Sequence, residues 1–172
     1  KQILTGSSRM KQRPIGPLVD ALRQLGCEID YLEKKGYPPL KIGKPKKLEA
    51  AKEVTVDAGI SSQYLTALLL IAPVLPNGLV LHLKGDMVSE SYLDMTLRML
   101  KEFGIKYKKK NQSITINKQS YKAKDFVVEA DWSASSYYFS IAALAKKANI
   151  SLRGLFDNSI QGDSAMVGIG RM

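Results

Sequence analysis

The stretch VTVDAGISSQYLTALLLIAPVL (residues 54–75) decides the fold, because a strand, a turn and a helix follow one another directly in it. Its β-branched start, Val54–Val56, favours an extended strand. Ser61 and Ser62 are typical of the residues that begin a helix. The residues after them, 65–72, are apolar on nearly every side, which predicts a helix buried in the protein core.

The same order of strand, Ser- or Gly-rich turn and helix occurs four times along the chain. The four copies cover residues 2–25, 54–75, 81–103 and 127–145. Residues 53–117 have the full order β-α-β-α-β-β. Residues 2–42 have the order of the last part of such a unit, and residues from 126 onward have the order of its start. Units of this kind, repeated about every 65 to 80 residues, are expected to pack around a shared core because none can bury its apolar face alone.

We therefore predict an α/β fold of the α+β type, in which surrounding sheets bury the helices. The predicted helices are 15–25, 62–75, 90–103 and 133–147. The predicted strands are 2–5, 28–32, 40–42, 53–57, 79–84, 105–109, 113–117, 126–129 and 150–153. Pro14 suits the first turn of a helix, Gly26 and Gly104 suit the left-handed residue that ends one, and Asn111-Gln112 predicts a hairpin.

Composition is typical of a globular protein without disulfides. The chain has 172 residues, 45% of them hydrophobic and 24% charged, which is enough for a core. Its single cysteine, Cys27, excludes an internal disulfide and favours a reducing compartment. The longest apolar run, 65–75, is too short to cross a bilayer, and no secretory signal is recognisable. We expect a cytoplasmic protein without a membrane partner. Because the chain starts at Lys1, directly before a strand, and stops at Met172 without a closing element, we expect it to be a piece of a longer protein.

The formal net charge of +10 indicates an anionic partner. The lysines are concentrated in two segments, 41–47 and 106–110. Charge runs of this kind usually form solvated loops or protect the edge of a sheet. A nucleic-acid site is not favoured, because no aromatic residues alternate with the basic ones.

The residues most suited to binding an anion lie at predicted helix starts. Ser61, Ser62 and Gln63 open one helix and Ser89 precedes the next, with Tyr92 one turn further along. Free N–H groups and the positive end of the helix dipole attract phosphate there, although each serine also fits a simple capping role. Arg9 lies in an expected strand-to-helix loop, where its guanidinium suits a carboxylate or a phosphate.

Other chemistries find little support. His82, the sole histidine, stands alone on a predicted strand, and Cys27 has no histidine beside it that would activate a thiolate. The sequence holds no Cys/His cluster for a metal. We expect neither a metal nor a cofactor.

Four motifs in the same order make the chain similar to the 5-enolpyruvylshikimate-3-phosphate synthase family. They are LTGSSRMKQRPIG (4–16), SSQYLTALL (61–69), KGDMVSESY (84–92) and NSIQGD (158–163). A fifth segment, DWSASSYY (131–138), resembles the stretch in which family members cross from their first domain to their second.

The resemblance implies an enolpyruvyl transferase fold of two domains, each built from three βαβαββ units, with substrates in the cleft between them. By this resemblance 1–129 is most of the N-terminal domain, and 130–172 is the beginning of the C-terminal one. The implied reaction, part of aromatic amino-acid biosynthesis, moves the enolpyruvyl group of phosphoenolpyruvate to the 5-hydroxyl of shikimate 3-phosphate, without a cofactor. We expect the full-length protein to be a monomer and the chain alone to be inactive.

The resemblance also assigns roles to individual residues. Ser61, Ser62 and Ser89 match the serines that hold the 3-phosphate, and Tyr92 matches the tyrosine beside the shikimate ring. Gln63 matches a glutamine between the two substrates, and Arg9 an arginine that binds phosphoenolpyruvate. No residue of this chain matches the general acid or base of the family.

Two alternatives remain open at this point. UDP-N-acetylglucosamine enolpyruvyl transferase shares the fold and the chemistry, but it usually relies on a cysteine in a mobile loop, whereas Cys27 lies at a predicted strand. A noncatalytic basic module that binds nucleic acid would show binding that weakens steeply with salt.

Overall fold

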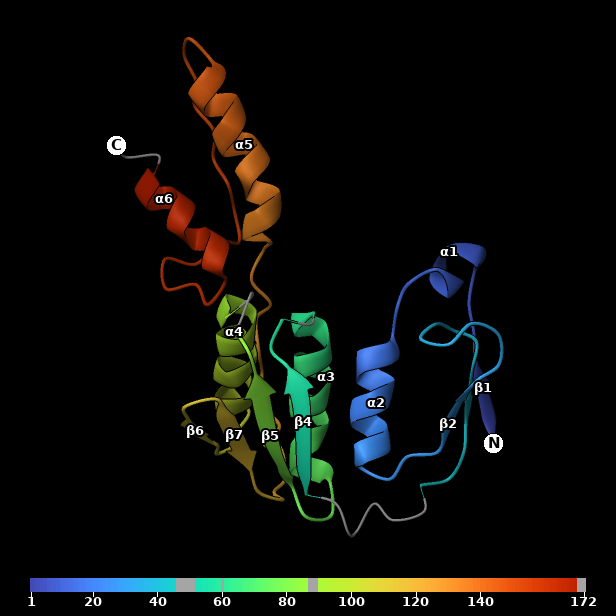
Figure 1. Ribbon diagram of the computed structural model, residues 1–172. Helices are drawn as coiled ribbons and strands as arrows, with labels where there is room; N and C mark the ends of the chain where they lie inside the picture. The colour runs from blue at the N-terminus through green and yellow to red at the C-terminus, as the bar shows by residue number, and fades with distance from the viewer. Residues whose placement is uncertain (46–51, 60, 87–89, 170–172) are drawn as a thin grey trace. The chain divides into compact units, whose positions relative to one another are not determined.

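The computed structural model describes residues 1–45, 52–59, 61–86 and 90–169. The chain divides into two compact units, Lys1–Lys122 and Ala123–Met172. Figure 1 shows the elements of both. Among the described residues, no helix combines the length and the apolar composition needed to cross a bilayer.

The first unit begins with a small antiparallel sheet of order β1-β3-β2. Its elements are β1 (Gln2–Leu4), α1 (Ser8–Lys11), α2 (Gly16–Gln24), β2 (Ile29–Tyr31) and β3 (Leu40–Ile42). Ile42 of β3 pairs with Gln2 on one side and with Ile29 on the other. Val19 of α2 packs with Ile29 and Leu40 in a minor core.

The larger sheet of the first unit has the order β4-β5-β7-β6, in which only β4 and β5 are parallel. Its elements are β4 (Glu53–Asp57), α3 (Ser62–Ile71), the 3-10 helix η1 (Ala72–Val74), β5 (Leu79–Lys84), α4 (Glu90–Glu102), β6 (Lys108–Lys110) and β7 (Ser113–Ile116). The βαβαββ order predicted for 53–117 is therefore confirmed. Helices α3 and α4 lie side by side and share the main core with this sheet (Figure 1).

In strand β5, every second residue is buried, as the alternation of apolar and polar residues in the sequence predicts. Leu79, Leu81 and Leu83 are buried, whereas Val80 and His82 are only partly so. Successive side chains of a strand point to opposite faces, so every second residue reaches the core.

Two glutamine side chains take the place of a neighbouring strand. Gln24 of α2 accepts from the N–H of Thr55 (2.9 Å) and donates to its carbonyl oxygen (3.1 Å), which joins α2 to the edge strand β4. Gln119 binds the N–H and the carbonyl oxygen of Lys106 in the same way, each at 2.8 Å. The predicted strand 105–109 is therefore wrong in its first half: a side chain, not a strand, pairs Lys106.

The residues predicted to start and end the helices are confirmed only in part. Gly26 and Gly104 adopt positive φ after α2 and α4, as expected. Pro14 precedes α2, and it is Pro17 that occupies the first turn. Helix α3 ends at Ile71, because Pro73 lacks the N–H that would extend it.

The prediction that this helix is buried on all sides is also wrong. Leu65, Leu68 and Leu69 are buried, but Leu70 is 46% and Ile71 36% exposed within the chain. The elements of the first unit cover only one side of α3.

The second unit contains α5 (Trp132–Leu144), the 3-10 helix η2 (Gly162–Ala165) and α6 (Met166–Ile169). Within its described residues there is no strand, so the strands predicted at 126–129 and 150–153 are wrong. The Ala130 N–H donates to the Gly154 oxygen (2.8 Å), but each of these residues lies one position beyond its predicted strand. β-branched residues form a strand only where a neighbour supplies a ladder, and Val127 and Val128 are exposed instead.

The carboxylate of Glu129 holds the second unit together. One oxygen accepts from the Trp132 indole N–H (2.6 Å) and the Phe156 N–H (2.7 Å). The other accepts from the Ser159 hydroxyl (2.7 Å) and the Gln161 amide (3.2 Å). Desolvation by itself raises the pKa of Glu129, but these four donors outweigh it and hold the pKa below its usual 4.5.

A glycine pair tests how closely β7 approaches the turn before β5. Gly78→Ala would place a Cβ atom 2.2 Å from the Ile116 oxygen at φ +67°, whereas Gly36→Ala, at φ +89°, meets nothing within 4 Å. We expect urea unfolding to show a loss of about 1–2 kcal/mol for Gly36→Ala, from backbone strain alone. Gly78→Ala should lose roughly 3 kcal/mol or more; equal losses would contradict the described packing.

The sole tryptophan, Trp132, reports on the Glu129 network. Because the folded-state pKa of Glu129 is lowered, its stabilising effect is present above the unfolded value of 4.5 and is lost as the pH falls through the lower folded value. We expect a transition in Trp132 fluorescence below pH 4.5, which Glu129→Gln removes because a neutral amide has no such titration. Asp157→Asn, an exposed control in the same unit, should keep it; a transition retained in Glu129→Gln would contradict this role.

Candidate functional site

The candidate site lies where the two parallel strands of the first unit end. Asp57 at the end of β4 is paired with Lys84 at the end of β5, so both strands stop at the same edge of the sheet (Figure 1). The chain turns from β4 into α3 and from β5 toward α4 at this edge. Ligands commonly bind outside the carboxyl ends of parallel strands.

Asp57 shapes the first of these turns. Its Oδ1 accepts from the Gly59 N–H at 2.8 Å, and the Ala58 N–H donates to the Lys84 oxygen at 2.7 Å. A Cβ atom on Gly85 would lie 3.9 Å from the same Oδ1. The turn that leads into α3 therefore lies against the start of the segment that leads into α4.

The start of α3 leaves donors available. Ser61 is the N-cap residue, and its Oγ accepts from the Gln63 N–H at 3.4 Å, so the capping role considered for it is confirmed. The side chains of Ser62 and Gln63 have no hydrogen-bond partner among the described residues. Ser62 is half-buried and Gln63 is exposed. These two groups, with the free first-turn N–H of the helix, are suited to an anion.

A pair of threonines fixes the start of α4 beside that of α3. The hydroxyls of Thr66 and Thr96 lie 2.8 Å apart, and Thr96 donates to the Tyr92 oxygen at 2.9 Å. Thr96 is only 6% exposed. Ser62 precedes Thr66 by four residues and Tyr92 precedes Thr96 by four, which is about one helical turn in each case. Ser62 and Tyr92 thus lie on the N-terminal side of the same helix contact.

The remaining predicted residues are placed differently. Ser89 lies outside the described residues, so its predicted convergence with Ser62 stays a prediction. Arg9 lies in the short helix α1, not in a loop as expected, because the Ser7 Oγ caps this turn by accepting from the Met10 N–H at 3.4 Å. The Arg9 side chain is exposed and has no ion pair or hydrogen bond with the described part of the chain.

Thr66 and Thr96 were not predicted as part of the site, because both stand in largely apolar helical segments. Their spacing of four residues from Ser62 and Tyr92 was the available signal. His82, the sole histidine, lies 3.3 Å from the Glu53 carboxylate, a contact between β5 and β4.

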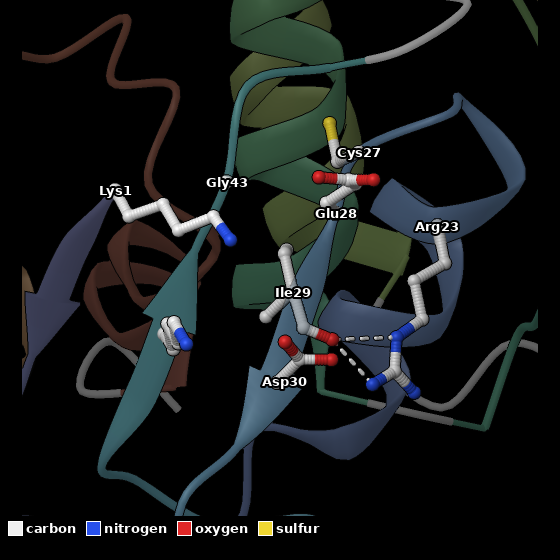
Figure 2. Close-up of a pocket in the computed structure, with 8 residues that line it drawn as sticks. Lys1, Arg23, Cys27, Glu28, Ile29, Asp30 and Gly43 are labelled. Carbon is white, nitrogen blue, oxygen red and sulfur yellow. Dashed lines mark hydrogen bonds between the residues drawn. The ribbon is translucent and has the colours of Figure 1, made fainter.

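Away from the candidate site, a hollow of about 400 Å³ lies over the small sheet (Figure 2). Arg23 stands beside it and donates twice to the Ile29 oxygen (3.0 and 2.5 Å). Lysine and carboxylate side chains line it together, which favours no single sign of ligand charge. Burial raises the pKa of the Cys27 thiol at its wall, which disfavours a nucleophilic thiolate. Across the described ranges, no three His, Cys, Asp or Glu side chains are grouped to hold a metal.

A family model described as EPSP synthase (3-phosphoshikimate 1-carboxyvinyltransferase) matches residues 1–172. The 3-phosphoshikimate 1-carboxyvinyltransferase of Bacteroides fragilis (strain YCH46) is 49% identical over 162 residues, which are 94% of this chain and 39% of the relative. That of Erwinia tasmaniensis is 44% identical over 164 residues, with 94% and 37% coverage. The chain therefore spans about 39% of the length of such relatives.

Solved structures agree on the fold. An EPSP synthase from Acinetobacter baumannii superposes with a TM-score of 0.68 at 23% identity, over 91% of this chain and 34% of that one. The mixed fold of helices and sheets predicted from the sequence is thus confirmed.

The threonine pair can be tested by a double-mutant cycle. Thr66→Val and Thr96→Val should each lower the free energy of unfolding by about 1 kcal/mol, since each removes one hydroxyl of a partly buried bond. The double variant should lose at least about 0.5 kcal/mol less than the sum. Thr115→Val on β7 is the control and should stay within about 0.5 kcal/mol of the parent. Strict additivity in urea unfolding would show that the hydroxyls do not interact.

Proposed function

Because this chain belongs to the EPSP synthase (3-phosphoshikimate 1-carboxyvinyltransferase) family, we propose that the protein containing it moves the enolpyruvyl group of phosphoenolpyruvate to the 5-hydroxyl of shikimate 3-phosphate. The match over 1–172, together with relatives of that name at 49% identity, supports the proposal. In this proposal 1–129 belongs to the N-terminal domain and 130–172 to the beginning of the C-terminal one.

The observation that carries the proposal is the adjacency of the helix starts after β4 and β5. Ser61, Ser62 and the α3 amides bind the 3-phosphate, and Ser89, which precedes α4 in the sequence, binds it as well. A phosphate dianion at the positive ends of two helices gains charge-assisted hydrogen bonds without a metal. The net charge of +10 attracts both substrates.

The other predicted residues complete the substrate half-site. Tyr92, 52% exposed, lies beside the shikimate ring, and Gln63 lies between the two substrates. The guanidinium group of Arg9 donates paired hydrogen bonds to phosphoenolpyruvate. The 5-hydroxyl oxygen adds to the enolpyruvyl carbon and gives up its proton, while the methylene carbon gains a proton and becomes a methyl group. The methyl group then loses a proton as the C–O bond to phosphate breaks, which restores the double bond and releases phosphate. The general acid and base that these proton transfers need are not among the residues assigned in this chain.

In this proposal the chain forms the shikimate 3-phosphate half-site but does not turn over. The full-length protein is a cytoplasmic monomer that needs no cofactor.

Binding to the isolated chain tests the half-site directly. Calorimetric titration should show that shikimate 3-phosphate binds and that shikimate, which lacks the phosphate, does not. Ser62→Ala should weaken binding about tenfold or more, because a hydrogen bond to a charged group is lost. Ser120→Ala, an exposed serine after β7, is the matched control and should bind like the parent.

Three outcomes would contradict the proposal. The full-length protein would release no phosphate from phosphoenolpyruvate in the presence of shikimate 3-phosphate. It would accept UDP-N-acetylglucosamine instead. Or the chain would bind generic DNA with a steep salt dependence and ignore the sugar phosphate.

A further inference from the structure

One hydrogen bond joins the segment that carries Arg9 to the start of α3. Tyr64, the residue after Gln63, donates its hydroxyl proton to the carbonyl oxygen of Pro14, fifty positions earlier in the chain. Pro14 lies between α1, which carries Arg9, and α2. We propose that Tyr64 is a positioning residue that sets Arg9 relative to the phosphate-binding end of α3; this inference rests on the proposed function.

The path from Pro14 back to Arg9 is stiff. The N–H of Lys11 donates to the Ser7 oxygen (3.1 Å), that of Gln12 to the Arg9 oxygen (3.2 Å), and that of Arg13 to the Met10 oxygen (3.1 Å). Consecutive turns closed by backbone hydrogen bonds move as one piece. A displacement at Pro14 is therefore transmitted to Arg9.

The same segment is also held on its other side. The N–H groups of Ile15 and Gly16 both donate to the Gly36 oxygen, at 2.8 and 3.1 Å. Lys11 forms an ion pair with Glu33 at 2.8 Å. These contacts fix the Arg9 segment to the loop between β2 and β3, whereas the Tyr64 hydrogen bond joins it, within the described residues, to α3.

That connection matters because the two substrates must meet. In the proposed site, α3 holds the sugar phosphate and Arg9 holds phosphoenolpyruvate. A misplacement of about 1 Å between reacting partners lowers the rate strongly. The Arg9 guanidinium has no partner among the described residues, so its position depends on the backbone beneath it.

The chain provides a matched control at the far end of the same helix. Tyr121 donates its hydroxyl to the Leu70 oxygen at 2.7 Å, close to the end of α3. Tyr64→Phe and Tyr121→Phe each remove one hydroxyl that binds a carbonyl oxygen and keep the ring. A purely structural role predicts similar consequences for both.

Steady-state kinetics of the full-length protein that contains this chain provide the test. Tyr64→Phe should raise the KM for phosphoenolpyruvate about three- to tenfold. The KM for shikimate 3-phosphate should change less than about twofold, and Tyr121→Phe should leave both KM values unchanged. In an Arg9→Ala background, Tyr64→Phe should have no further effect, because its action passes through Arg9.

Three results would overturn the inference. Tyr64→Phe would behave like Tyr121→Phe, or it would raise both KM values equally, or its effect would persist in full without the Arg9 side chain. The unmodified protein distinguishes this failure from that of the proposed function: turnover by the parent upholds the function whatever Tyr64→Phe does, whereas absence of turnover overturns both.

Discussion

The parallel pairing of β4 with β5 is the constraint on which the candidate site depends. Its register, Asp57 opposite Lys84, brings both strands to an end at the same level. Parallel neighbours need a crossover between them, and here α3 is that crossover. Two helices that follow such strands both start at one edge of the sheet, and their positive ends then face the same region. An antiparallel pairing would have placed the two starts at opposite edges.

Packing between α3 and α4 in the main core keeps the starts of the two helices together. The main core contains Leu65, Leu68 and Leu69 of α3 together with Leu93 and Leu97 of α4, all nearly inaccessible. Apolar contacts alone do not fix how far one helix slides along another, whereas a directional hydroxyl pair does. The Thr66–Thr96 bond supplies this direction one turn below Ser62 and Tyr92. Stability and site geometry therefore depend on the same interface.

Whether an element could be predicted depends on whether its signal is local in the sequence or arises from contacts between distant residues. Apart from the first half of 105–109, the strands and helices of 53–117 were predictable because alternation and capping residues are local signals that agree with the packing there. Strands at 126–129 and 150–153 failed because a strand needs a partner that the sequence pattern cannot supply. The threonine pair and the bond from Tyr64 to Pro14 depend on three-dimensional proximity, so periodicity did not indicate them. The anion role proposed for Ser61–Gln63 rests on helix-start chemistry together with the family resemblance.

The central claim is that the starts of α3 and α4 form one anion site. Amide NMR of the chain, titrated with shikimate 3-phosphate, tests it most directly. We expect the amides of Ser61–Gln63 and those of Glu90–Tyr92 to shift together, with one shared dissociation constant. Shifts confined to one helix start, or two unrelated dissociation constants, would contradict it.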